Sequence, residues 1–193
     1  MTVQRDAIVK RLAGLNHQSH DGIIPAYGVL MSVLPTAFWN NFCRRLIEAV
    51  PPEKRSDVDQ GLADGYNDCS YHTGQGVVTS KEFKAVVEPM VTEGAKDVLR
   101  GAFAVLTATG SAKAGIVQNK EGERMVIRAE HYYQGDGDPG PMRAYLLRGA
   151  CAAFYSVVYG APYPDGLGAY TCEQVAGVEC GDPFGEFVVT KKP

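Results

Sequence analysis

The sequence predicts an α+β domain in which an antiparallel sheet of two hairpins packs against helices. Three observations support this prediction. Apolar residues recur at helical spacing in several segments, two pairs of strand-like runs each flank a turn with glycine, and a further helical segment separates the two pairs. With 193 residues, the chain is long enough to form one hydrophobic core.

The N-terminal segment is predicted to precede the main domain. Residues 5–14 have the apolar spacing of a short helix, and residues 16–22 are polar and typical of a loop. We therefore expect residues 1–33 to form an N-terminal extension and residues 34–193 to form the main domain.

Two helices are predicted next. Pro35 suits a first helical turn, and Pro51 ends the helix that follows it. The apolar side of this helix consists of residues at fourfold spacing: Phe38, Phe42, Leu46 and Val50. A second helix, over about 53–69, is weaker because Gly61 and Gly65 lower its helix propensity.

The clearest helix start lies at Thr79. The run Thr79-Ser80-Lys81-Glu82 has the pattern of a capping box, in which Thr79 is the N-cap and Glu82 reaches back to it. The apolar spacing continues to Leu106. We expect Pro89 to bend or restart this helix, because proline lacks a backbone donor, and Gly110 to end it.

Two hairpins form the predicted sheet. The first pairs residues 112–119 with residues 124–133 across a four-residue connection that contains glycine. The second pairs residues 170–180 with residues 183–190 around the turn Gly181-Asp182-Pro183. Between the hairpins, Asp138 is the predicted cap of a helix that runs over 142–159.

Composition and charge exclude several classes of function. The net charge is −3 and the basic residues are scattered, so the sequence offers no basic patch for binding nucleic acid. No apolar run approaches the roughly 18 residues of a membrane span, and the N-terminus lacks the pattern of a secretory signal. The cysteine count of 5 is odd and fits no disulfide framework. We expect a cytoplasmic protein with reduced thiols.

The segment from Pro141 to Val189 resembles the 4-vinyl reductase domain family. Members of this family end in a helix with a central glycine, a strand, and a Gly-Asp-Pro-aromatic turn into a final strand. The matching residues here are Gly149, Gly160, Gly181-Asp182-Pro183-Phe184 and Phe187. The helix and hairpin over 79–133 fit the family's order of elements. The resemblance implies a ligand-binding fold, distantly similar to that of the TRAPP transport subunits.

Members of the family differ in function. They include a protein linked to bacteriochlorophyll vinyl reduction, archaeal hydrocarbon-binding proteins, and sensor domains of regulators that respond to aromatic compounds. The chain has no segment that resembles a DNA-binding or ATPase domain, so we do not expect a complete regulator of this kind.

The resemblance also implies a metal, usually zinc, held by cysteines that flank the Gly-Asp-Pro turn. In this chain the two positions are Gly177 and Gly185. Glycine offers no side-chain donor, whereas zinc takes four N, S or O ligands. A shifted register breaks the Gly-Asp-Pro alignment and recruits four other side chains, Cys151, Cys172, Glu173 and Cys180. We therefore predict that the fold is kept without zinc or another cofactor.

A second set of metal-capable residues lies nearer the N-terminus. His17 and His20 are spaced H-x-x-H, and Cys69 and His72 are spaced C-x-x-H, which would suit a tetrahedral ion if the two loops met. Alternatively, the first pair is solvated and the second belongs to a turn with a buried cysteine. His72 is also a candidate by itself, because it precedes the glycine-rich segment 73–76, which is predicted to be a loop.

The candidate ligand site surrounds the predicted helix 142–159. Small residues on this helix either pack closely on the sheet or leave an apolar cavity lined by aromatic rings. His131, at the end of a strand, is either a structural group or a titrating group at the rim of such a cavity. The predicted ligand-binding residues are Trp39, His72, Phe103, His131, Tyr133, Tyr145, Phe154 and Tyr155.

Three functions remain open. The first is binding of a small hydrophobic or aromatic molecule in a pocket between the helices and the sheet, in a sensing or carrier role. The second is that of an accessory protein or enzyme in tetrapyrrole vinyl reduction. This hypothesis has weaker support, because the sequence contains no recognisable nicotinamide or flavin motif and no catalytic residue is identified. The third is a dimeric interaction module. We favour a binding module that forms a homodimer and is not itself an enzyme.

Overall fold

The computed structural model describes residues 5–13, 24–32, 34–135, 139–141 and 143–193. Its helices are α1 (Arg5–Ala13), α2 (Thr36–Glu48), α3 (Arg55–Thr79), α4 (Lys81–Val86), α5 (Ala95–Ala108) and α6 (Tyr145–Tyr159). Its strands are β1 (Ile24–Ala26), β2 (Val29–Met31), β3 (Ala112–Lys120), β4 (Arg124–Tyr132), β5 (Tyr170–Ala176) and β6 (Gly185–Lys191). Short 3₁₀ turns lie at Pro52–Lys54, Glu88–Met90 and Val178–Cys180.

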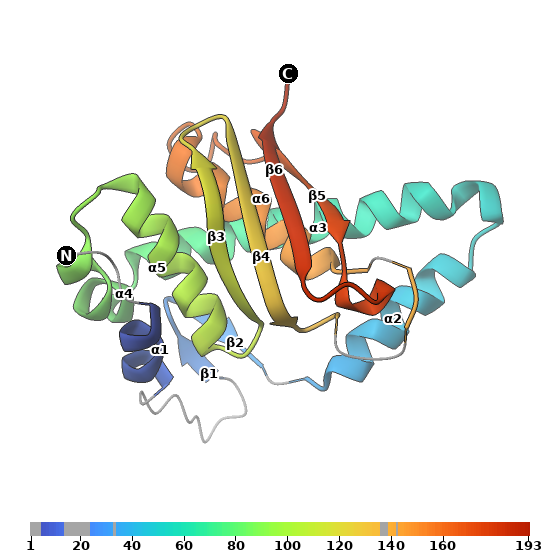
Figure 1. Ribbon diagram of the computed structural model, residues 1–193, viewed down its shortest axis with the longest axis horizontal. Coiled ribbons are helices and arrows are strands. Elements are labelled where there is room, and N and C mark those ends of the chain that lie inside the picture. The colour runs from blue at the N-terminus through green and yellow to red at the C-terminus, as the bar shows by residue number, and fades with distance from the viewer. Residues whose placement is uncertain (1–4, 14–23, 33, 136–138, 142) are drawn as a thin grey trace.

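The two predicted hairpins are confirmed, and they join into one antiparallel sheet. The first strand of the second hairpin is shorter than predicted, because β5 ends at Ala176 and a 3₁₀ turn follows at Val178–Cys180. The strand order is β3-β4-β6-β5, so β4 and β6 connect the hairpins. Side chains along β5 alternate between buried and exposed, as expected for a sheet with one covered face. In Figure 1 the sheet stands in front of α6, and the long helix α3 crosses behind them. The predicted α+β fold class is therefore confirmed.

Helix α6 packs between the sheet and α3, and glycines allow this close approach. A Cβ added at Gly149 would lie 2.5 Å from the backbone nitrogen of Asn67, and one added at Gly74 would lie 2.9 Å from the ring of Phe154. The sequence predicted that a helix ends near residue 69. This prediction is wrong, because α3 continues to Thr79. Packing against α6 outweighs the low helix propensity of glycine.

The N-cap of α4 lies one residue after the predicted one. The Ser80 hydroxyl accepts a hydrogen bond from the Phe83 amide at 3.1 Å, which makes Ser80 the cap. Thr79 is instead the last residue of α3, and its hydroxyl donates to the Gln75 carbonyl at 2.8 Å. The predicted break at Pro89 is confirmed, since the chain forms a 3₁₀ turn at Glu88–Met90 before α5.

Helix α6 begins at Tyr145, later than predicted, and no side chain of its own N-cap residue caps it. Two glutamines from elsewhere accept hydrogen bonds from its first amides. Gln134 Oε1 accepts from the Leu146 amide at 2.6 Å, and Gln174 Oε1 accepts from the Ala144 amide at 3.2 Å. The predicted cap Asp138 lies outside the described residues. The predicted end of this helix near Tyr159 is confirmed.

Helix α2 has its apolar stripe on the outside. Phe38, Phe42 and Leu46 are exposed by 50%, 45% and 39%, although their spacing predicts a buried side. Cys43 faces inward and is buried. The stripe is therefore part of the molecular surface of this chain.

The N-terminal elements contribute a second apolar cluster beside α5. Ile8 and Leu12 of α1 are buried there, together with Ala26 and Tyr27 of the β1–β2 hairpin. The hairpin turns at Tyr27 and Gly28, both with positive φ, as a two-residue turn requires. Within the described ranges, no helix is long and apolar enough to cross a membrane.

Candidate functional site

The candidate site is a cavity of about 630 Å³ between α2 and the segment that leads into α6. We call it the α2 cavity. Its volume lies within the roughly 300–1,000 Å³ range that is usual for small-molecule sites. It is lined by Thr36, Ala37, Asn40, Asn41, Cys43, Arg44, Ile47, Glu48, Gln134, Pro139, Gly140, Pro141, Arg143 and Tyr145.

Polar side chains from three elements meet beside the α2 cavity. The Cys43 thiol accepts a long contact from Gln134 Nε2 at 3.9 Å and also bonds with the Tyr66 hydroxyl. Burial raises the pKa of the Cys43 thiol, and the bond with Tyr66 lowers it in part. The net shift is upward, so the thiol is kept in its neutral, less nucleophilic form.

Tyr145 connects the cavity to a charged pair on α3 and α6. Burial, and next a hydrogen bond with the Asp59 carboxylate, raise the pKa of the Tyr145 hydroxyl. Asp59 also pairs with Arg148, at 3.3 Å between Oδ2 and Nη1. Tyr145 therefore remains a neutral phenol that offers an aromatic surface to the cavity.

The wall formed by α2 carries amide and guanidinium groups. Arg44 donates to Asn41 Oδ1 and to Glu48 Oε1, both at 3.0 Å. Asn40 Oδ1 is buried and accepts no hydrogen bond from the described residues. A buried acceptor without a donor is unusual, and Asn40 is one of the residues that line the α2 cavity.

A second cavity, of about 500 Å³, lies between α1, α5 and β3, and we call it the α5 cavity. Its lining residues are Arg5, Asp6, Arg100, Phe103, Ala114, Gly115 and Ile116. The two arginines are paired with carboxylates, Arg5 with Asp6 at 3.3 Å and Arg100 with Asp97 at 2.9 Å. Charged side chains are three of the seven residues that line the α5 cavity, against three of the fourteen that line the α2 cavity (Arg44, Glu48 and Arg143).

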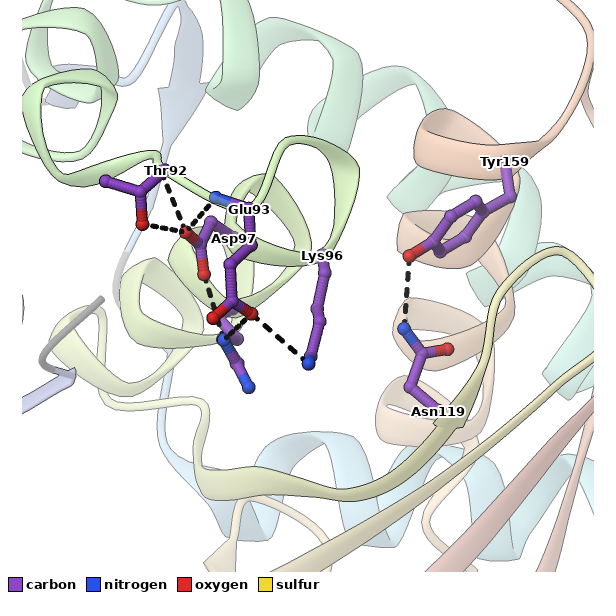
Figure 2. Close-up of polar contacts among 7 residues, drawn as sticks. Thr92, Glu93, Lys96, Asp97, Asn119 and Tyr159 are labelled. Carbon is purple, nitrogen blue, oxygen red and sulfur yellow. Dashed lines mark hydrogen bonds and ion pairs between the residues drawn. The ribbon is translucent and has the colours of Figure 1, made fainter. Parts of the chain in front are cut away.

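A hydrogen-bonded loop supports one side of the α5 cavity. Figure 2 shows the buried carboxylate of Asp97 facing the loop before α5. Asp97 Oδ2 accepts from the backbone amides of Thr92 and Glu93 at 2.9 and 2.8 Å. Arg100 also bridges to Glu93, at 3.1 Å. These contacts fix the start of α5 and position Arg100.

Three tyrosines fill the space between α6 and the sheet near the β3–β4 turn. The Tyr155 hydroxyl donates to Asn119 Oδ1 at 3.1 Å and to the Lys120 carbonyl at 2.8 Å. Asn119 in turn donates to the Tyr159 hydroxyl at 3.1 Å, as Figure 2 shows. The ring of Tyr170 stands edge-on to that of Tyr155, with centroids 4.7 Å apart. These phenols have partners within the protein and form part of the core.

The predicted ligand residues do not meet at one place. Phe103, Phe154 and Tyr155 lie in the core between the helices and the sheet, and the rings of Phe103 and Phe154 pack edge to face at 5.7 Å. Phe103 also lines the α5 cavity, whereas Tyr145 lines the α2 cavity. Trp39 lies between α2 and α3, with its ring 6.2 Å from that of Tyr66.

The remaining predicted residues line neither cavity. His72 is within α3 rather than in a loop, where its Nδ1 lies 2.9 Å from the Tyr163 hydroxyl. His131 is exposed on β4. The Tyr133 hydroxyl donates to the Leu34 carbonyl at 2.8 Å, which ties the end of β4 to the start of α2.

The side chains near the Gly-Asp-Pro turn do not fit a metal site. Gly177 and Gly185 lie against buried Gln174, Glu179 and Tyr132 rather than against further thiols. The shifted set is also divided. Cys151 and Cys172 contact each other in the core, but the Cys180 thiol donates to the Gly140 carbonyl at 3.4 Å.

The other predicted metal set is tested only in part. His17 and His20 lie outside the described residues, so the set with Cys69 and His72 stays a prediction. Among the residues that the structure describes, no group of three or more His, Cys, Asp or Glu side chains could hold a metal ion.

Comparison with known structures identifies the fold. The chain is similar to the phenol-responsive sensory domain of the transcription activator PoxR, solved with phenol, with a TM-score of 0.69 and 14% identity over 99% of this chain and 92% of that one. It is also similar to a trafficking protein particle complex subunit 3 from Naegleria fowleri covalently bound to palmitic acid, with a TM-score of 0.52 and 13% identity over 82% of this chain and 93% of that one. At these identities the likeness establishes a shared fold.

No family model and no curated protein sequence matches the chain. The support for the expected fold comes instead from the two similar structures, a phenol-responsive sensory domain and a trafficking protein particle complex subunit. This agrees with distant kinship to both. Membership of a named family stays a prediction.

Several cavity residues were not singled out by the sequence. Asn40, Asn41 and Gln134 belong to no motif, and Arg143 follows the run of prolines before α6. The sequence signal that could have pointed to two of them is the pair of neighbouring amides, Asn40 and Asn41, within the predicted helix. The side of α2 that lines the cavity became visible only once the orientation of α2 was known.

Proposed function

We propose that this protein binds a small hydrophobic or aromatic molecule in the α2 cavity and acts as a sensory or carrier module. The observation that carries the proposal is the lining of this cavity. Apolar surface from Ala37, Ile47 and Tyr145 lies beside the amides of Asn40 and Gln134. An apolar wall with a few polar groups is suited to a planar molecule that carries one or two polar substituents.

The comparison structures support the same class of ligand. One is a sensory domain that responds to phenol, and the other carries palmitic acid. The α5 cavity is the less suitable site for such molecules, because charged side chains make up a larger share of its lining than of the lining of the α2 cavity.

Native mass spectrometry of freshly purified protein tests whether a molecule is retained. Calorimetric titration with phenol, toluene and palmitate then distinguishes a polar aromatic, an apolar aromatic and an acyl-chain ligand. We expect binding of the aromatic probes. The proposal is rejected if no adduct is seen and none of the three probes binds. Visible absorbance from a retained tetrapyrrole would favour the role in vinyl reduction instead.

Two cavity-filling variants identify the site. Ala37→Trp fills the α2 cavity from an exposed helical position and is expected to weaken binding by about tenfold or more, by steric exclusion. Gly115→Leu is the matched control, since it fills the α5 cavity. Its new Cβ is tolerated, because the nearest atom, Arg5 Nη1, would be 3.8 Å away, an ordinary contact distance. Loss of binding in the control alone would place the ligand in the α5 cavity.

We also propose a homodimer, favoured by the exposed stripe on α2. The rings of Phe38 and Phe42 are stacked, with an interplanar angle of 3°, and Leu46 extends the apolar surface by one turn. A straight apolar stripe on one helix is suited to pairing with the same stripe of a second copy, because a twofold interface is self-complementary.

A further inference from the structure

A buried carboxylate lies just before the Gly-Asp-Pro turn. Glu179 is 1% exposed and belongs to the 3₁₀ turn Val178–Cys180. One of its oxygens accepts a hydrogen bond from the Tyr132 hydroxyl. The other accepts from Gln174 Nε2 at 2.9 Å and from the Arg143 amide at 3.0 Å. Hydrogen bonds from neutral donors thus compensate the burial of this charge. We call Tyr132, Gln174 and Glu179 the Glu179 cluster.

The Glu179 cluster occupies the space that metal-binding cysteines would need. A Cβ at position 177 would lie 2.7 Å from Gln174 Nε2 and 2.8 Å from Glu179 Oε2. A Cβ at position 185 would lie 2.6 Å from the ring of Tyr132. Real Cβ atoms essentially never come this close to another atom. A side chain at either position would therefore require the residues of the Glu179 cluster to shift from their observed places.

The Glu179 cluster also holds the chain segment that leads into α6. The Glu179 carbonyl accepts from the Gly140 amide at 2.8 Å, its carboxylate accepts from the Arg143 amide, and Gln174 Oε1 accepts from the Ala144 amide at 3.2 Å. Gly140 and Arg143 both line the α2 cavity. One wall of this cavity is therefore fixed by bonds to the cluster.

We infer that the Glu179 cluster takes the structural place of a metal in this chain, so that the Gly-Asp-Pro turn and the wall of the α2 cavity are held without one. Tyr132 closes the cluster from β4, because its hydroxyl donates to Glu179 and accepts from the Val178 amide at 3.1 Å. Glu179 is a positioning residue, since the cluster acts on the cavity through the backbone amides of Gly140, Arg143 and Ala144. The effect of the Glu179 cluster on ligand binding in the α2 cavity rests on the proposed function. Its ability to hold the turn without a metal does not.

Metal content and hydrogen exchange test the inference. Protein produced in medium supplemented with zinc should contain substoichiometric zinc by elemental analysis, and EDTA should leave its Tm unchanged. Stoichiometric zinc, or a Tm that falls with EDTA, would overturn the inference.

The variant Glu179→Gln replaces an acceptor by a donor facing Tyr132. We expect the amides of Arg143 and Ala144 to exchange about tenfold faster, the change that follows when local opening becomes easier by about 1.4 kcal/mol. Strand β4 should keep its protection. Glu173→Gln is the matched control, because Glu173 is exposed on the same strand as Gln174. If Glu179→Gln does not fold, Tyr132→Phe tests the same cluster, because it removes one hydroxyl that donates to Glu179 and accepts from the Val178 amide.

Unchanged exchange at residues 143 and 144 in a folded variant would refute the role of the Glu179 cluster. The affinity for phenol is a separate measurement. If the wild-type protein binds no probe but exchange responds as expected, the proposed function fails and the structural inference stands. If the wild-type protein binds phenol, Glu179→Gln should weaken that affinity and Glu173→Gln should not.

Discussion

Asp97 is a buried acid that organises a loop through several hydrogen bonds. Its carboxylate accepts from the amides of Thr92 and Glu93 and from Arg100. We predict that Asp97→Asn lowers the free energy of unfolding by about 2–3 kcal/mol, because an amide group leaves one of these donors unmatched and removes the charge. Chemical denaturation at pH 7 measures this change. Asp57→Asn, also in the first turn of a helix but exposed, is the control and should have little effect.

The contribution of Asp97 to the free energy of unfolding is expected to depend on pH. Burial raises the pKa of Asp97, but the amides of Thr92 and Glu93 and the guanidinium of Arg100 outweigh it, so the pKa is lowered in the folded protein. The carboxylate therefore contributes fully above the unfolded pKa of about 4, and its contribution is lost as the pH falls through the folded pKa. The difference in the free energy of unfolding between the wild-type protein and Asp97→Asn should shrink as the pH falls from 5 to about 2. A difference that stays constant over this range would contradict the assignment.

At the scale of elements, the contact between α3 and α6 depends on Gly149. A Cβ there would lie 2.5 Å from the Asn67 nitrogen, so even alanine forces the two helices apart. We predict that Gly149→Ala lowers the stability by about 1–3 kcal/mol. Gly61→Ala, on the exposed side of α3 with no atom within 4 Å of the new Cβ, should instead stabilise the protein by about 0.5–1 kcal/mol. Thermal denaturation compares the two, and destabilisation by both would argue against close packing as the cause.

Local patterns predicted the elements whose signals agree with their tertiary surroundings. The hairpins β3–β4 and β5–β6 have clear alternation and turn residues, and both are observed. The end of α3 was missed because Gly74 lowers the local helix propensity. What favours glycine at this position is the close approach of the Phe154 ring, a contact that only the folded chain makes. The spacing of the stripe on α2 showed that the helix is amphipathic, but spacing alone does not reveal that the stripe lies on the molecular surface.

The candidate site was less predictable than the fold. Tyr145 was expected, and it lines the α2 cavity. The neighbouring Gln134 was not, because its role depends on Cys43 and on the Leu146 amide, which come from two other segments of the chain. Phe154 and Tyr155 have the aromatic character of a binding site, but in the folded chain they are core residues. Residue type alone does not separate these two roles.

At the scale of the whole molecule, α2 connects a cavity to a surface. One side of this helix lines the α2 cavity with Asn40 and Ile47, and another side exposes the apolar stripe of Phe38, Phe42 and Leu46. A molecule bound in the cavity contacts the same helix that we propose to pair with a second copy. Binding and dimerisation would then share one free energy of coupling, which acts equally in both directions.

We predict that the wild-type protein dimerises and that Phe42→Glu makes it monomeric, because a buried, unpaired carboxylate at the centre of an apolar interface is unfavourable. Phe42 is 45% exposed, so the monomer should stay folded, as circular dichroism would verify. Arg45→Ala changes a more exposed residue of the same helix and should leave the dimer intact. Sedimentation velocity measures the state of each protein. A wild-type chain that is monomeric at roughly 100 μM, where a Kd in the micromolar range would give mainly dimer, would exclude the interface.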